Sequence, residues 1–70
     1  MSARLVQVQA VQGVGRVRVT WSADWAEYIV QAVAADGHQV AEYFTDDRAD
    51  ALGTADHMLA ELAARAGMPA

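Results

Sequence analysis

Few side chains in this chain have the type and spacing that catalysis requires. His57 precedes Glu61 by four residues, and in a helix this spacing places both on one face. Such a pair could supply half of a metal site or an acid/base pair, but we favour the ordinary ion pair of an exposed helix. The chain has no cysteine, and its serines and threonines lie in capping, turn or strand contexts, so a nucleophile with an oriented base is missing. The sequence therefore predicts no enzyme, no catalytic residue, no bound metal and no cofactor.

Two further patterns have the composition of a ligand site without its spacing. Asp46, Asp47 and Asp50 lie close together, but the central glycine and the terminal glutamate of the calcium-loop pattern are absent. We expect these carboxylates to begin a helix, where the helix dipole favours negative charge. Gly13 and Gly15 lack the third glycine and the following helix of a dinucleotide fingerprint, so we expect them to form a turn.

Arginines near the N-terminus suggest a site for nucleic acid. Arg16 and Arg18 share one face of a strand, and we expect Gln7 and Gln9 of the neighbouring strand to join them in a hydrogen-bonding strip. The charge of the chain opposes this function. Residues 1–23 carry three arginines and no acid, whereas residues 24–70 carry nine acids and two arginines, and the formal net charge is −4. Attraction to phosphates would be weak, so nucleic acid is the alternative partner and not the favoured one.

The elements that position these residues centre on the stretch from Ala26 to Thr45, where Asp36-Gly37 separates two valine-rich runs. Asp-Gly in this setting predicts a hairpin with a two-residue turn, because both turn positions need positive φ. The turn length sets the register. One face would contain the pairs Val33–Val40, Gln31–Glu42 and Ile29–Phe44, and the other the pairs Ala32–Ala41 and Val30–Tyr43. Both faces are mainly apolar, so we expect both to be covered.

An earlier hairpin is predicted with a two-residue Gly13-Val14 turn after a strand at residues 4–12. This register sorts apolar pairs onto one face and polar pairs onto the other: Val8–Val19 and Ala10–Val17 against Gln9–Arg18 and Gln7–Thr20. A slip of one residue would exchange the faces of the first strand. Two tryptophans follow, Trp21 on the apolar face and Trp25 at the start of the next strand, and we expect both to pack in the core or at its rim.

The C-terminal third is predicted as a helix that Thr45 or Asp46 caps. One stripe at helical spacing would face the sheet, formed by Leu52, Ala55, Leu59, Leu62, Ala63 and Ala66. Gly53 is unfavourable inside a helix and could break it in two. Gly67 and Pro69 would end it.

The predicted fold class is α+β: a four-stranded antiparallel sheet of two consecutive hairpins with one C-terminal helix packed on one face. We expect residues 1–70 to form a single domain with an ordered core at residues 4–66. The helix is expected on the side of Val30, Ala32, Ala41 and Tyr43, where small residues allow close approach. The uncovered face would then consist of Ile29, Val33, Val40 and Phe44, with Gln31 and Glu42 among them.

Two resemblances accompany this description. The segment from Tyr28 to Leu59, with its V-A-E-Y-F hairpin strand, acidic turn and helix, resembles the sheet-and-helix half of HicB-type antitoxins. It departs from them in having two extra N-terminal strands and in lacking their glycine-rich turn. The short, acidic, cysteine-free profile with one helix is similar to phage-encoded inhibitors of host defence, including anti-CRISPR proteins. That likeness covers composition and transfers no residue.

A hydrophobic share of 54% is high for 70 residues, and one helix covers one of two apolar faces. We therefore expect a homodimer, formed through Ile29, Val33, Val40 and Phe44 with Glu42 at the rim, and a further protein partner. An inhibitor of a host defence complex from a phage or mobile element is the favoured function. The alternatives are a nucleic-acid-binding or antitoxin-like regulator and a purely structural assembly subunit. No stretch is apolar enough to span a bilayer, so we expect a cytoplasmic protein, in the host cytoplasm if it is phage-encoded.

Overall fold

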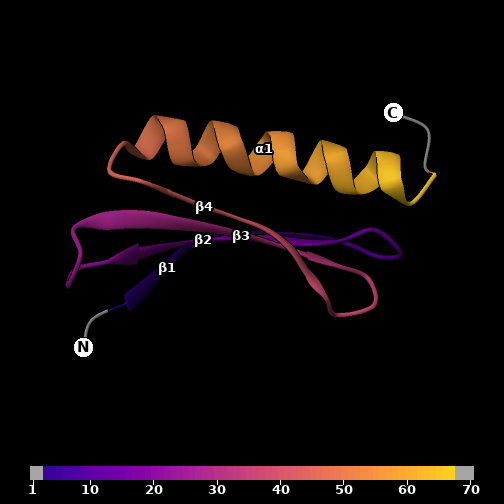
Figure 1. Ribbon diagram of the computed structural model, residues 1–70, viewed down its shortest axis with the longest axis horizontal. Coiled ribbons are helices and arrows are strands. Elements are labelled where there is room, and N and C mark those ends of the chain that lie inside the picture. The colour runs from indigo at the N-terminus through magenta and orange to yellow at the C-terminus, as the bar shows by residue number, and fades with distance from the viewer. Residues whose placement is uncertain (1–2, 68–70) are drawn as a thin grey trace.

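The computed structural model describes residues 3–67 and places a single helix on one side of a four-stranded sheet (Figure 1). The elements are β1 (Ala3–Val11), β2 (Gly15–Ser22), β3 (Glu27–Ala34), β4 (Gln39–Thr45) and α1 (Arg48–Arg65). All three strand pairs are antiparallel, and the sheet order is β1-β2-β3-β4. The predicted α+β fold class is confirmed. Within the described residues, no helix has the length and apolar character that crossing a membrane would require.

The core lies between α1 and the two central strands. Val17, Val19 and Val30 are fully buried, since β-branched side chains suit a pleated surface under a helix. The helix contributes Ala51, Ala55 and Leu62 as its buried residues. Val30 and Ala32 are buried, and Ala41 packs against the core, so the side expected to receive the helix is confirmed.

The N-cap of α1 is one residue after Asp46, the later of its two predicted caps. Asp47 is the N-cap, and its side chain accepts a hydrogen bond from the backbone N–H of Asp50 at 3.1 Å. Thr45 accepts a hydrogen bond from the Asp47 backbone instead. The helix runs unbroken through Gly53. Gly67 follows its end with a φ of 74°, as expected for a C-terminal stop, whereas Pro69 lies outside the described residues.

The packed stripe of α1 is shifted slightly from the predicted one. Ala51 and Met58 belong to it, while Ala66 is exposed. Alanine signals burial weakly in a sequence with so much alanine, which explains the error at both ends of the stripe.

The register predicted for β1 and β2 is wrong by one residue. The connection comprises residues 12–14, so that Val11 pairs with Gly15 and Gln9 with Val17. The cause is Val14, which is only 3% exposed and belongs to the core. In the two-residue turn it would have faced solvent. Burial of this side chain favours the longer loop and exchanges the faces of neighbouring β1 residues.

The second hairpin also has a longer turn than predicted, but it keeps most of its register. Gly37 adopts a φ of 94°, and the backbone N–H of Ala34 donates to the carbonyl of His38. Val33 therefore pairs with Gln39, which makes the expected Val33–Val40 pair wrong. A bulge follows, and the remaining pairs agree with the prediction: Ala32–Ala41, Gln31–Glu42, Val30–Tyr43 and Ile29–Phe44.

Trp21 and Trp25 have different environments. Trp21 is half-buried, and its ring centroid lies 4.7 Å from that of Tyr28. Trp25 was predicted to start a strand, but it lies in the loop between β2 and β3 and is 76% exposed. Ala26 after it has a φ of 52°, so the chain turns sharply before β3 begins and the tryptophan is directed away from the core.

Candidate interaction surfaces

The face of the sheet opposite α1, here called the open face, is arranged in three cross-strand rows. Residues paired across antiparallel strands share a face. The rows, read from β1 to β4, are Leu5–Thr20–Ile29–Phe44, Val8–Arg18–Gln31–Glu42 and Ala10–Arg16–Val33–Gln39. Among the described residues, no element covers these rows (Figure 1).

The middle row contains a hydrogen-bonded ladder. Arg18 Nη2 donates to Gln31 Oε1 at 2.9 Å, and Gln31 Nε2 donates to Glu42 Oε2 at 3.0 Å. The same Gln31 nitrogen lies 3.4 Å from Gln39 Oε1. Arg18, Gln31 and Glu42 each have at least one partner within the ladder, and this lowers the penalty for removing water from the row.

Apolar side chains lie on both sides of this ladder. Phe44 is 50% exposed and Leu5 is 57% exposed, while Ile29 and Val33 are half-buried. A shallow depression of about 380 Å³ is bounded by Leu5, Arg18, Thr20, Ile29 and Gln31. The face therefore combines apolar side chains with an ordered polar ladder and with Arg16 and Gln39 of the third row, a mixture typical of protein interfaces.

Four of the five residues predicted for the association face lie on the open face: Ile29, Val33, Phe44 and Glu42. Val40 does not. It is the extra residue of the β4 bulge, and it packs against the core on the helix side. A bulge re-aims the side chain that it inserts, so the regular alternation used for the prediction fails at this position.

The predicted strip for nucleic acid is divided between the two faces. Arg16 and Arg18 lie on the open face, but Gln9 pairs with Val17 and Gln7 with Val19 on the helix side. In the described part of the chain, Gln9 Oε1 is buried without a hydrogen-bond partner. The expected grouping is therefore wrong, because it depended on the register that Val14 changes.

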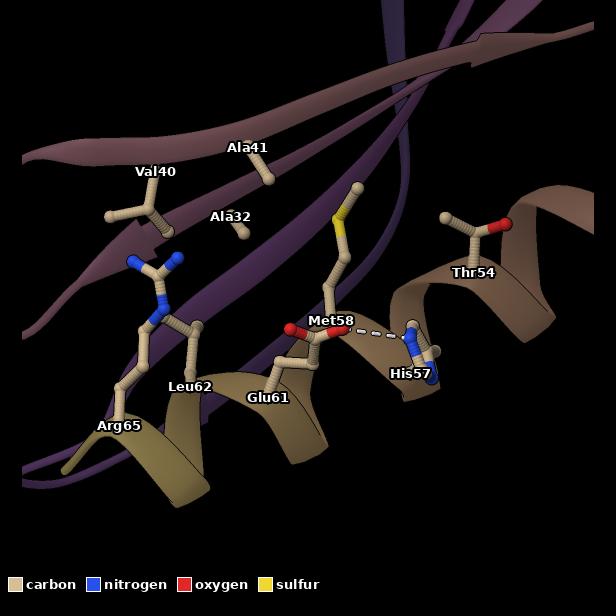
Figure 2. A pocket seen from close by; sticks show the side chains of 9 residues that line it. All are labelled: Ala32, Val40, Ala41, Thr54, His57, Met58, Glu61, Leu62 and Arg65. Atoms are coloured by element: carbon tan, nitrogen blue, oxygen red, sulfur yellow. Dashed lines mark ion pairs between the residues drawn. The ribbon is translucent and has the colours of Figure 1, made fainter. Parts of the chain in front are cut away.

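His57 and Glu61 form the contact that their spacing predicts. Nε2 of His57 lies 2.8 Å from Oε1 of Glu61 (Figure 2), and the two side chains are 73% and 60% exposed. Ion pairs this exposed contribute little to stability. Within residues 3–67, no group of three or more histidine, aspartate or glutamate side chains is placed to hold a metal ion.

Trp25 is the exposed residue that sequence reasoning missed. Large aromatics at exposed tips are frequent anchors in protein interfaces. Asp24 before it is typical of turns, but the left-handed conformation of Ala26 has no sequence signal. The exposed position could not be read from residue types.

Comparison with known proteins assigns no family to this chain. No protein-family model matches it, and neither does any curated protein or solved structure.

Proposed function

We propose that the chain is a non-catalytic protein-binding module that forms a homodimer through its open face. One observation carries this proposal: Leu5, Ile29 and the half-exposed Phe44 lie on one side of a ladder in which Arg18, Gln31 and Glu42 bond to one another, and Val33 lies on its other side. Burying such a face removes apolar area from water, and the bonds within the ladder reduce the polar cost. The non-catalytic part is supported by the exposed surroundings of His57 and Glu61.

The charges of the ladder favour a second copy as the occupant. Arg18 on β2 and Glu42 on β4 lie on opposite sides of Gln31 on β3, each about 4.8 Å away across the sheet. A two-fold axis that lies between the two sheets and runs parallel to β3 puts Arg18 of one copy opposite Glu42 of the other. The dimer then contains this pair twice. The two sheets would pack aligned, about 10 Å apart, as in a sandwich. An axis perpendicular to the strands would instead bring the two Arg18 side chains together.

Sedimentation at micromolar concentration tests the dimer. We expect Phe44→Glu to convert it to monomer, because a charge would be buried among apolar side chains. Val11→Glu is the matched control, since Val11 is 41% exposed but lies outside the open face. A monomeric wild type, or a Phe44→Glu variant that stays dimeric, would refute the proposal.

Charge exchange tests the orientation of the two copies. Arg18→Glu and Glu42→Arg should each weaken the dimer, because like charges then meet across the interface. The double variant Arg18→Glu/Glu42→Arg should recover it, since each exchanged residue again meets an opposite charge. If both single variants dimerise as tightly as the wild type, the axis along β3 is wrong even if the open face is the interface.

The second part of the proposal concerns a partner outside the dimer. Asp46, Asp47 and Asp50 are exposed where α1 begins, on the side of the sheet away from the open face, and the net charge is −4. An acidic surface is complementary to a basic groove. We propose that the dimer acts in the host cytoplasm as a phage or mobile-element inhibitor that occupies the basic groove of a nucleic-acid-binding complex.

Site-specific crosslinking distinguishes this inhibitor from its alternatives. A photo-crosslinker at position 50 should link the chain to one host protein whose nucleic-acid binding is then lost, whereas one at position 11 should not. Crosslinks to further copies of the chain alone would indicate an assembly subunit. A salt-sensitive DNA mobility shift that disappears in Arg16→Ala/Arg18→Ala would indicate a nucleic-acid-binding regulator.

A further inference from the structure

A second surface lies between β4 and α1, on the side of the sheet away from the open face (Figure 2). It is a groove of about 210 Å³, here called the edge groove. Its lining is mainly apolar at the floor and polar at the rim, and it comprises Ala32, Val40, Ala41, Thr54, His57, Met58, Glu61, Leu62 and Arg65. The two alanines leave the space that larger side chains would fill. An apolar cavity of about 150 Å³ accepts a benzene ring, so this one has room for a single apolar side chain and not for a drug-sized cofactor.

The strand beside the edge groove can accept another strand. β4 is the last strand of the sheet order, and every second residue of an edge strand directs its backbone N–H and C=O groups outward. The β4 bulge turns Val40 toward the helix side next to Ala41. A segment paired to β4 would direct alternate side chains toward the same side, where the edge groove lies.

One charge at the rim, that of Arg65, favours an acidic ligand group. Glu61 is held by His57 at 2.8 Å. Arg65 extends from the last turn of α1 toward Val40 (Figure 2), and no carboxylate within residues 3–67 forms an ion pair with it. A guanidinium with free donors beside an apolar floor is well suited to bind a carboxylate with two parallel hydrogen bonds.

We propose that the edge groove binds an extended segment of a partner protein. The segment pairs with β4 as an additional strand, places one apolar side chain on the floor formed by Ala41, Met58 and Leu62, and presents a carboxylate to Arg65. The carboxylate is that of an acidic side chain of the segment. This binding mode does not depend on the dimer, because the edge groove and the open face lie on opposite sides of the sheet.

A peptide array tests the proposal on the full chain. The probes are short Thr/Val-rich peptides with one variable apolar position, followed by aspartate or asparagine, each with a free or an amidated C-terminus. We expect binding by peptides with leucine, methionine or phenylalanine and one carboxylate, weakening about tenfold or more when no carboxylate is present. Binding of the amidated aspartate peptides supports a side-chain carboxylate, whereas binding that needs a free C-terminus would overturn it.

Two variants and one control locate the binding. Arg65→Gln should weaken it about tenfold, whereas Arg48→Gln, on the same helix but outside the edge groove, should not. Ala41→Leu should abolish binding by filling the floor, and circular dichroism checks that this variant is folded. When peptide binds, the changes in the NMR amide shifts of the chain should map to β4 and the second half of α1. This should hold both in the wild type and in the monomeric Phe44→Glu variant. No binding by any probe, or binding that survives both Arg65→Gln and Ala41→Leu, would overturn the proposal.

Discussion

The two hairpins of the sheet both have longer turns than predicted, but only the second returns to its predicted register. The pairs that flank the turns show the added length: Val11 pairs with Gly15 in the first hairpin and Val33 with Gln39 in the second. In the second hairpin, a bulge at the next residue, Val40, restores the expected pairs. In the first, the slip persists through most of β1, and a second irregularity comes only between Leu5 and Gln7.

This difference determines which side chains each hairpin places on the open face. The bulge in β4 keeps Ile29 and Phe44 together there and sends Val40 to the edge groove. The uncorrected slip in β1 exposes Val8, which is 46% exposed, and turns Gln9 toward the core side. One inserted residue can thus create a binding feature or displace one, depending on whether it is compensated within the same strand.

The largest expected effect comes from Gly15, where the first hairpin contacts β3. A Cβ at this position would lie 2.2 Å from the backbone oxygen of Val33, and φ is 135°. We expect Gly15→Ala to lower the free energy of unfolding by at least about 3 kcal/mol, because backbone atoms cannot move aside. Gly13→Ala is the control: φ is 80° but the space is open, so about 1–2 kcal/mol is expected. If urea unfolding gives the same loss of stability for both variants, the cost at Gly15 comes from its backbone conformation and not from its contact with β3.

The next effect tests why the first hairpin slips. Val14→Ala should cost about 2 kcal/mol, because two methyl groups are removed from a buried position. Val11→Ala in the same hairpin should change stability by less than about 0.5 kcal/mol, since Val11 is 41% exposed. Chemical denaturation measures both. If the Val14 variant is as stable as the Val11 variant, burial of Val14 does not hold the longer loop.

A smaller effect is expected from the bulge of the second hairpin. Val40 is half-buried against the core, so Val40→Ala should cost about 1 kcal/mol, roughly half the Val14 value. The NMR amide signals that report the pairing of Ile29 with Phe44 should be unchanged. The bulge results from the extra residue in the backbone and does not depend on the side chain at position 40. If the register of β4 shifts in NMR spectra of this variant, the side chain of Val40 fixes the bulge.

Local patterns predict most of the fold and part of the binding surface. Alternating valines, the Asp-Gly turn and the apolar stripe of α1 predict the element order, the covered face and the pairing of Ile29 with Phe44. Turn lengths are not predictable in this way, because Val14 is buried only once α1 is in place. Turn length determines that Arg18 and Gln9 lie on opposite faces and that Val40 lies on the helix side. These placements therefore depend on tertiary contacts and not on local sequence.

The smallest expected effect is a change with pH that occurs in the turn of the second hairpin and not in that of the first. Asp36 in the second turn accepts a hydrogen bond from the His38 backbone N–H at 3.0 Å, and this bond, followed by the His38 side chain, lowers the pKa of Asp36 below its ordinary 3.8. A carboxyl group with a lowered pKa in the folded state contributes stability that is present above 3.8 and is lost as pH falls through the folded value. The turn at residues 12–14 has no titratable side chain.

Acid should therefore loosen the second turn while the first keeps its structure. In an NMR titration, we expect the amides of Gly37 and His38 to shift as pH falls below 3.8, with Gly13 unchanged over the same range. Asp36→Asn should remove this transition, because the amide side chain can still accept the backbone hydrogen bond but cannot be protonated in this range. If Gly13 moves together with Gly37, the two turns open as one unit, and the contact of Gly15 with Val33 couples them.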